Sequence, residues 1–368
     1  MRSNSAIEAT GGSRAPEAGS AFRPLVSRLA LTVCVYVACG LGAGTLAVAQ
    51  SLPSPGLPAA GTDAGTDWVA ATVDMTLRRV SDRTWYVVGL PGMVTTENQG
   101  FNSNAGFVVT DDGVVVFDAL GTPGLGRRLR ELIATVTPLP ISQIVVSHYH
   151  ADHVYGLQGL AEPRVPIWAD VASKAYLTSA APEARLEERR ESLKPWVDAR
   201  TRILPPTHWV DGEARFTQGG QTFRLISAGP AHSAEDLMMV VEPEGVLFVG
   251  DLMFTGRIPF VADADVSAWI KAIDRVLASK PRFVIGGHGP ASSDAVADLS
   301  LTRDYLTYLR EQMAAAFDQG LDFEEAYSET DWSRFSRLPA FEVANRRNAY
   351  QTWLNVEREA LSGAGKTP

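Results

Sequence analysis

The chain has 368 residues and a formal net charge of −9, from 33 basic and 42 acidic side chains. Because an acidic protein is repelled by phosphate backbones, this charge excludes a general nucleic-acid binder, and no run of lysine or arginine predicts a local basic patch. The part beyond an N-terminal leader has about three hundred residues, which is enough to bury a large core in one domain with an appendage.

The N-terminus has the order of a secretory signal. Residues 1–28 carry four arginines, Leu29–Ala49 is apolar and uncharged, and Ala47-Val48-Ala49 offers a small-residue cleavage site before Gln50. This order predicts a signal peptide over residues 1–49 and export, to the periplasm of a bacterium. Because the charged leader is long, an uncleaved membrane anchor is the alternative.

Cleavage would remove both cysteines, since Cys34 and Cys39 lie in the leader. The mature chain would then form no disulfide, and no thiolate would serve as a metal ligand or nucleophile. Its net charge would be −11, because the leader carries four arginines and two glutamates. No membrane association is expected after cleavage.

Composition divides the rest of the chain into three parts. Residues 50–70 are predicted to be a linker, because Ser51–Gly65 is rich in proline, glycine and alanine. Strand and helix patterns predict a main domain over residues 71–298. Helical patterns predict a C-terminal extension over residues 299–368.

The first half of the main domain predicts strand pairs, then a helix and a buried strand. Asp111-Asp112-Gly113 between two apolar runs is a strong hairpin signal, and Pro123 suits the first turn of a helix. The predicted elements are strands at Met75–Val80, Thr84–Val88, Ala105–Thr110, Val114–Phe117 and Ile141–Ser147, and a helix at Pro123–Thr135.

The last of these strands leads into His148-Tyr149-His150-Ala151-Asp152-His153, which holds three of the six histidines of the chain. Residues i and i+2 on an extended backbone point the same way, so His148 and His150 would hold one ion. Asp152 and His153 follow where a helix would begin, and they would face a second ion. Imidazole and carboxylate without thiolate suit zinc, iron or manganese. The alternative is a polar loop whose histidines only form hydrogen bonds.

The second half of the main domain repeats paired strands followed by strand–helix alternation, which predicts two packed sheets with helices outside. Residues 161–205 have a mixed pattern, with a charged helix near Pro182–Leu193. The other predicted elements are strands at Ala214–Phe216, Gln221–Ile226, Leu237–Val241, Val246–Val249 and Arg282–Ile285, and a helix at Val266–Ala278.

Three more candidate ligands, His232, Asp251 and His288, each lie just past the end of a predicted strand. Loops on a rigid scaffold are where sites are usually built, and the glycines beside Asp251 and His288 permit a close approach of the backbone. His208, the remaining histidine, fits no ligand position, so it is predicted to be a surface or packing residue.

Two further features of the sequence each allow two interpretations. Asp118 either holds a histidine or backbone group near the metals, or it caps the end of a strand. Leu90–Asn104, with Met93 and Phe101, is either a flap over the site or a segment whose apolar residues pack.

The C-terminal extension predicts two helices, one after Asp294 that stops near Gly320 and one over about residues 340–360. Packing against the main domain is the expected role of their apolar stripes, and capping of the substrate cleft is the alternative. The first stripe recurs every fourth residue and consists of Leu301, Tyr305, Leu309, Met313 and Phe317.

The ligand motifs, in this order and in these strand-end settings, resemble the metallo-β-lactamase-fold superfamily of metallohydrolases over roughly residues 75–295. The resemblance implies an α/β (α+β) fold, a four-layer αββα sandwich with a metal site at one edge. It implies two Zn²⁺ as cofactors, with iron or manganese as alternatives. The implied ligands are His148, His150 and His232 for the first ion, Asp152, His153 and His288 for the second, and Asp251 as the bridge.

The segment Gly250-Asp251-Leu252-Met253-Phe254 is similar to the corresponding segment of glyoxalase II. Zinc β-lactamases often have cysteine or serine in place of this aspartate. The expected function is a zinc-dependent hydrolase that uses a metal-bridging hydroxide to cleave an ester, thioester or lactam bond of a small molecule. Asp152 would orient the water and act in proton transfer. The alternatives are a metallo-β-lactamase and a mononuclear-iron persulfide dioxygenase. The sequence identifies no substrate-binding residues and no oligomeric state.

Overall fold

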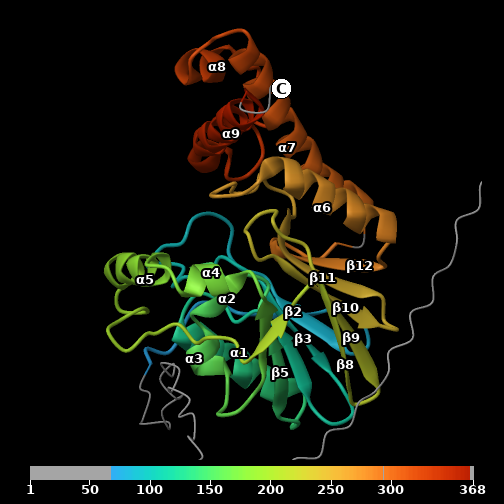
Figure 1. Ribbon diagram of the computed structural model, residues 1–368. Helices are drawn as coiled ribbons and strands as arrows, with labels where there is room; N and C mark the ends of the chain where they lie inside the picture. Colours follow the sequence, from blue (N-terminus) through green and yellow to red (C-terminus); the bar gives the residue numbers. More distant parts are fainter. Residues whose placement is uncertain (1–67, 293, 365–368) are drawn as a thin grey trace, which may run out of the picture. The chain divides into compact units, whose positions relative to one another are not determined.

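The structure is a computed structural model that describes residues 68–292 and 294–364 (Figure 1). The described residues all belong to one compact unit. The predicted signal peptide and most of the predicted linker lie outside the described residues. None of the helices in the described ranges is both long enough and apolar enough to cross a membrane.

The first of two β-sheets has the order β1-β2-β3-β4-β5-β6-β7. Neighbouring strands from β1 to β4 are antiparallel, and β5, β6 and β7 are then added in parallel. The strands are β1 (Leu77–Arg79), β2 (Thr84–Val87), β3 (Ala105–Val109), β4 (Val114–Phe117), β5 (Ile141–Val145), β6 (Ile167–Asp170) and β7 (His208–Val210).

The second sheet has the order β12-β11-β10-β9-β8. Its strands β8 to β11 form an antiparallel meander, and β12 pairs in parallel with β11. The strands are β8 (Glu213–Gln218), β9 (Gln221–Ser227), β10 (Leu237–Glu242), β11 (Val246–Phe254) and β12 (Phe283–His288).

The helices begin where the sequence offers caps. Pro123 opens α1, and the side chain of Thr122 accepts a hydrogen bond from the backbone N–H of Leu125. Asp265 caps α6 in the same way. The helices are α1 (Pro123–Val136), α2 (Ala151–Val154), α3 (Leu157–Leu160), α4 (Ser173–Leu177), α5 (Ala181–Ser192), α6 (Val266–Ser279), α7 (Ala295–Asp318), α8 (Phe323–Glu329) and α9 (Phe341–Ala364).

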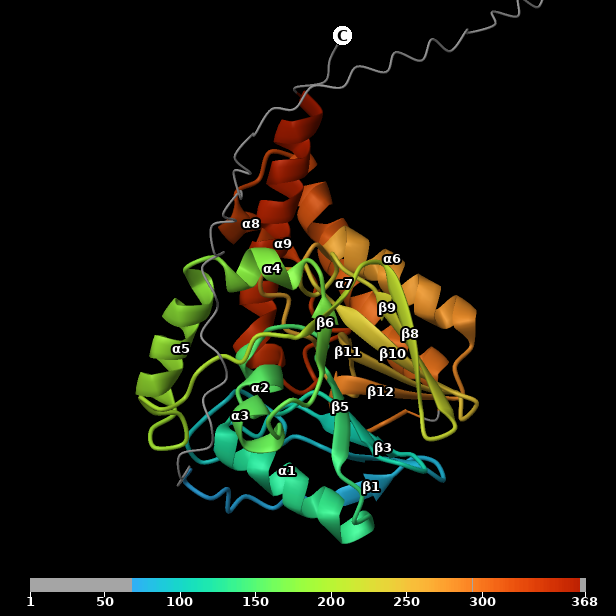
Figure 2. The same ribbon diagram turned by 60° about the horizontal axis from the view of Figure 1, so that its bottom comes forward.

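Side chains alternate between the two faces of each strand, and both faces of the sheets are covered, which gives four layers. In β4, Val115 and Phe117 face the second sheet, where the ring of Phe117 stacks on Phe248 at 5.1 Å between centroids. Val114 and Val116 face the opposite way, into the cluster that α1 and α3 cover. Helices α6 and α7 cover the outer face of the second sheet (Figure 2). The predicted αββα sandwich is therefore confirmed.

The C-terminal helices pack against the main body of the described unit. Tyr305, Leu309 and Met313 of α7 share one buried cluster with Trp269 of α6 and with residues of β11 and α9. This is the packing role that the apolar stripe predicts. Leu301 lies outside the cluster, because a spacing of four drifts from the helical period of 3.6 residues per turn.

The structure contains elements that the sequence pattern does not predict. Strands β6 and β7 and helices α3, α4 and α8 have only three to seven residues, and periodicity cannot be recognised over such lengths. The helix expected to begin at Asp152 is present as α2, one short turn over Ala151–Val154. Strand β11 continues through Phe254, five residues beyond its predicted end at Val249. Asp251 therefore lies within a strand, whereas the sequence places it after one.

Candidate metal centre

The seven predicted ligands come together from elements of both sheets. They are supplied by the loop after β5, by α2, by the loop between β9 and β10, by β11 and by the end of β12. They form two groups, and within each group the candidate ligand atoms lie within 4.8 Å of one another. The groups correspond to the two implied metal positions, except that Asp251, the implied bridge, falls in the first group. The first is His148, His150, His232 and Asp251, and the second is Asp152, His153 and His288.

Asp251 lies between the two groups. Its Oδ2 is 3.3 Å from Nε2 of His232 in the first group and 3.3 Å from Nε2 of His288 in the second. Its Oδ1 is 3.2 Å from Nε2 of His153, also in the second group. This carboxylate therefore contacts both groups, and it would be a ligand shared between them.

Three ring nitrogens converge in the first group. Nδ1 of His150 is 2.9 Å from Nε2 of His148 and 3.0 Å from Nε2 of His232. A ring nitrogen carries one proton or one in-plane lone pair, so it forms one hydrogen bond and not two. A shared cation would satisfy all three nitrogens together.

The outward-facing nitrogens of three histidines have fixed partners. Nδ1 of His148 is 2.9 Å from the Ser147 hydroxyl, and Nδ1 of His288 donates to the backbone oxygen of Asn102 at 2.7 Å. Nδ1 of His153 is 2.9 Å from Oδ2 of Asp118. Such partners set the orientation of each ring and leave its Nε2 facing the centre.

Asp118 contacts both His153 and Ser147, the second residue after β5. Its carboxylate accepts hydrogen bonds from the backbone N–H of Ser147 at 2.7 Å and from its hydroxyl at 2.8 Å. Asp118 is buried and adopts a left-handed backbone with φ of 63°. It therefore has the histidine-holding role that the sequence suggested, and it does not simply end a strand.

Burial keeps the histidines of the first group neutral. It lowers the pKa of His232 to about 4, against the opposing charge of Asp251. It also lowers the pKa of His148 and of His150 well below the ordinary value, with neighbouring imidazoles adding to the effect. Neutral imidazole is the form that binds metal, so these rings need not lose a proton to do so.

The second group concentrates charged side chains. Burial opposes ionisation of His153, but Asp251, Asp152 and Asp118 outweigh it and raise the pKa of His153 well above its usual value. Burial would raise the pKa of Asp251 and Asp152, but nearby imidazoles, including His288 and His153, hold both below the ordinary value. Two ionised carboxylates in an enclosed site favour a cation between them.

Three side-chain atoms of the clustered residues are buried without a hydrogen-bond partner: Nε2 of His153, Oδ1 of Asp251 and Nδ1 of His232. The first two lie 3.2 Å apart, and a shared cation would be a partner for both. Buried polar atoms are rarely left unpaired. Imidazole nitrogen and carboxylate oxygen are both zinc ligands, so the donor set fits a metal.

Two glycines permit the close approach that the sequence suggested. A Cβ at Gly287 would lie 1.8 Å from Oδ1 of Asp251, so only glycine leaves this carboxylate room. Gly250 has φ of +53°, and a Cβ there would lie 2.7 Å from Cβ of Ser147.

Asn102 and Ser103 contact the site, and the sequence did not single them out. The Asn102 side chain donates to Oδ2 of Asp152 at 3.1 Å, and the Ser103 hydroxyl donates to the Asp152 backbone oxygen at 2.5 Å. Both lie in the predicted flap. The polar residues of that segment are the sequence signal that could have identified them. Phe101 is buried in the core and Met93 is 44% exposed, so the segment packs at one end and is open at the other.

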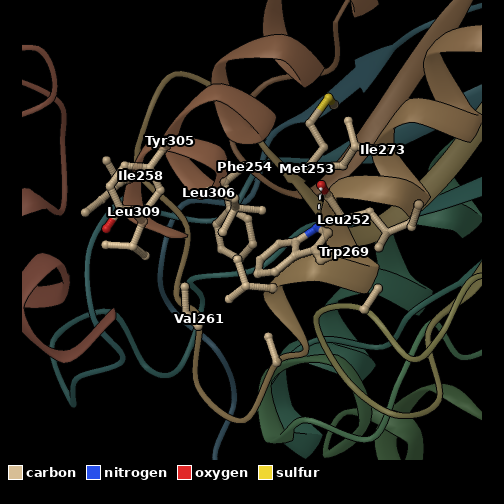
Figure 3. Close-up of a cluster of buried hydrophobic side chains, with 14 of the residues drawn as sticks. Leu252, Met253, Phe254, Ile258, Val261, Trp269, Ile273, Tyr305, Leu306 and Leu309 are labelled. Atoms are coloured by element: carbon tan, nitrogen blue, oxygen red, sulfur yellow. Dashed lines mark hydrogen bonds between the residues drawn. The ribbon is translucent and has the colours of Figure 1, made fainter. Parts of the chain in front are cut away.

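Aromatic rings enclose the centre from the side of the second sheet. The ring of Phe254 stacks on the imidazole of His288 with 4.7 Å between centroids and 10° between planes. The indole of Trp269 meets His232 edge-on at 5.0 Å, and its Nε1–H donates to the backbone oxygen of Leu252 (Figure 3). This hydrogen bond fixes the indole against the ligand.

His208 belongs to neither group. It lies exposed on β7, and its ring is 4.6 Å from that of Trp168. The structure confirms the prediction of a surface or packing histidine.

Comparisons with known proteins agree with this geometry. A family model described as the metallo-beta-lactamase superfamily matches residues 98–288. The chain is 24% identical over 225 residues to the metallo-beta-lactamase type 2 of Bacteroides fragilis, a match that covers 59% of the chain and 80% of that protein. It is 29% identical over 181 residues to the 2,4-dinitroanisole O-demethylase subunit alpha of Nocardioides sp. (strain JS1661), covering 48% of the chain and 50% of that protein.

Solved structures share the fold at low identity. The stereoselective inverting sec-alkylsulfatase Pisa1 from Pseudomonas sp. has a TM-score of 0.61 and 19% identity, covering 76% of this chain and 50% of that one. A metallo-beta-lactamase from Pontibacter korlensis has a TM-score of 0.51 and 21% identity, covering 64% and 99%. The chain thus spans about half the length of the demethylase subunit and of the alkylsulfatase.

The family match covers more than half of the chain and includes all seven clustered residues. The fold, the donor groups and the match lead to the same conclusion. The chain belongs to the metallo-beta-lactamase superfamily, and it is a metal-dependent hydrolase.

Proposed function

We propose that this enzyme uses two zinc ions to cleave an ester, thioester or lactam bond of a small molecule. The observation that carries the proposal is the pair of donor groups that meet at Asp251. His148, His150 and His232 would hold one ion, and Asp152, His153 and His288 would hold the other. Two divalent ions, when bound, polarise a carbonyl oxygen and make water a nucleophile near neutral pH.

Asp152 is the residue best placed to move a proton. Its side chain is 21% exposed, whereas the side chain of Asp251 is 4% exposed, so Asp152 faces the accessible side of the site. The hydrogen bond from Asn102 fixes one of its carboxylate oxygens. The carboxylate would orient the attacking water, take up its proton and return that proton to the leaving group.

Asp251 favours a general hydrolase of the glyoxalase II kind over the cysteine-containing β-lactamases. The β-lactamase of Bacteroides fragilis, which this chain matches over 80% of its length, supports lactams as the second candidate substrate. A mononuclear-iron persulfide dioxygenase would leave one of the two donor groups without a metal, so the second group argues against it.

Export to a bacterial periplasm is part of the proposal. The N-terminal order of basic, apolar and small residues supports it. A freely diffusing small-molecule substrate fits such a location.

The variant Asp152→Asn tests the proposal. We expect turnover to fall by about 10²- to 10⁴-fold, because the amide cannot accept a proton, while the fold is kept. The assay uses an aryl thioester, a p-nitrophenyl ester and nitrocefin, with the far-ultraviolet circular dichroism spectrum as the check of folding. If nitrocefin is the only one of the three that is cleaved, a lactam is favoured as the substrate.

The matched control is Asp211→Asn, which removes an exposed carboxylate outside both groups. It should leave turnover unchanged. Unchanged turnover in Asp152→Asn would remove Asp152 from the mechanism. Oxygen uptake with a persulfide, in a protein that cleaves none of the three substrates, would refute the hydrolase assignment.

A further inference from the structure

His232 is a candidate ligand whose outward-facing nitrogen is buried without a hydrogen-bond partner. Its Nε2 faces the centre, 3.3 Å from Oδ2 of Asp251, and the unpartnered atom is Nδ1. The outward-facing nitrogens of the three other buried histidines of the centre each contact an oxygen, and these histidines are His148, His153 and His288. Because buried polar atoms are rarely left unpaired, Nδ1 of His232 should have an acceptor of another kind.

The tautomer of this ring makes Nδ1 a donor. A neutral imidazole carries one proton and one in-plane lone pair. If the lone pair on Nε2 of His232 is given to an ion, the proton lies on Nδ1. The ligand form of His232 therefore needs an acceptor on the side away from the centre.

The indole of Trp269 lies against the ring of His232. The ring centroids are 5.0 Å apart and the planes differ by 74°, a T-shaped pair in which the edge of one ring points at the face of the other. An aromatic face carries negative partial charge and attracts an N–H group. The N–H of the indole is already in use, because it donates to the backbone oxygen of Leu252 at 3.2 Å (Figure 3). The indole thus offers a face as acceptor.

Helix α6 fixes the indole relative to the loop between β9 and β10. The backbone N–H of Asp265, which caps the helix, donates to the backbone oxygen of Ala231 at 3.0 Å, and Ala231 directly precedes the ligand. Further along the helix, Nη2 of Arg275 donates to the backbone oxygen of Ala228 at 3.3 Å. The helix is attached to this loop on both sides of the residue that carries the indole, so the two rings keep their relation.

Apolar packing also holds the indole in place. Trp269 is 0% exposed and shares one buried cluster with side chains of β11 and α7 (Figure 3). Phe254 of the same cluster is farther from His232, with 5.9 Å between centroids, and its ring stacks on His288 instead. Each of these two aromatic rings therefore lies against one candidate ligand, and the ring against His232 is that of Trp269.

We propose that the indole face of Trp269 accepts the Nδ1–H of His232 and so keeps the Nε2 of this ligand directed at the first metal position. Trp269 is then a positioning residue, because its buried side chain acts through His232. Its role is the same as that of the oxygens that orient the other buried histidines. The inference rests on the proposed function, since it assigns the residue to one of the two metal positions.

The first test is the NMR spectrum of the imidazole N–H protons in the zinc-loaded protein with isotope-labelled histidine. A hydrogen bond to oxygen moves such a proton downfield, whereas the ring current over an aromatic face moves it upfield. We expect the Nδ1–H of His232 upfield of those of His148, His153 and His288, with cross-peaks to the indole protons that identify it. Trp269→Leu should remove this upfield displacement, and Trp269→Phe should keep it, because phenylalanine retains an aromatic face.

The second test is the zinc affinity of the two positions, measured by competition with a chromophoric chelator. Loss of a partner that orients a ligand histidine typically weakens metal binding by about 10- to 100-fold. Trp269→Leu should therefore weaken the binding of one of the two zinc ions by about tenfold or more, and Trp269→Phe should recover most of that affinity.

The matched control is Trp353→Leu, which makes the same substitution in the same cluster. Trp353 lies on α9, and its ring contacts those of Phe317 and Phe323. The control should lower the free energy of unfolding, because it also leaves a cavity, but it should not change the zinc affinity or the N–H spectrum.

A His232 N–H signal at the downfield position of the other three, or one that Trp269→Leu does not move, would overturn the inference. An equal loss of zinc affinity in Trp353→Leu would do the same, because it would assign the loss to the core and not to the ring contact. The wild-type spectrum decides the question even if the leucine variant does not fold. A wild-type protein that binds no zinc would refute the proposed function as well, whereas two zinc ions and hydrolysis without the upfield signal would refute only the role of Trp269.

Discussion

Replacing Asp251 by asparagine should abolish most of the activity. We expect a loss of about a thousandfold or more in turnover, because the amide lacks the charge and the second equivalent oxygen that two ions would share. Metal content should fall as well, with the second position affected most. Thioester or nitrocefin hydrolysis and inductively coupled plasma mass spectrometry measure the two effects.

Asp211→Asn is again the control, since it removes the same charge from an exposed position. It should behave as the wild-type protein in both assays. Full activity together with full metal content in Asp251→Asn would exclude a bridging role for this carboxylate.

The variant Gly287→Ala should damage the site without changing a ligand. Its Cβ would lie 1.8 Å from Oδ1 of Asp251 and 3.0 Å from the carbonyl carbon of Gly250, so the carboxylate has to move. A misplacement of about 1 Å typically costs about a hundredfold in rate, and we expect a loss in kcat/KM of that order. Overpacking should also lower the free energy of unfolding by about 1–3 kcal/mol.

Two comparisons isolate this effect. Gly212→Ala adds a methyl group where no atom lies within 4 Å and where φ is +75°, so it reports backbone strain alone. In a background with Asp251→Ser, the added methyl group should cost less stability, because the clashing carboxylate is absent. Wild-type activity in Gly287→Ala, or an equal stability cost in both backgrounds, would contradict the close contact.

The sequence predicts the architecture well where its signals are strong. The hairpin at Asp111-Asp112-Gly113 and the helix that opens at Pro123 follow from turn and cap chemistry, and both are present. The short strands β6 and β7 escape prediction because three or four residues do not display an alternation. Their pairing depends on the neighbours that the sheet supplies.

The candidate site also has a part that the sequence predicts and a part that it does not. Spacing alone indicates that His148 and His150 face one point, and the order of the strand-end motifs indicates the remaining partners. Contacts between residues distant in sequence are not encoded in any local pattern. Asn102 reaches Asp152 across 50 positions, and the contact of Trp269 with His232 joins α6 to a loop between two strands.

The most direct test of the account is the metal content of the purified chain. Inductively coupled plasma mass spectrometry should find about two zinc ions per chain, because the two donor groups meet at one shared carboxylate. That result would justify the search among thioesters, esters and lactams. About one iron per chain would contradict the binuclear centre and favour the persulfide dioxygenase, and a chain that binds no metal would contradict the account as a whole.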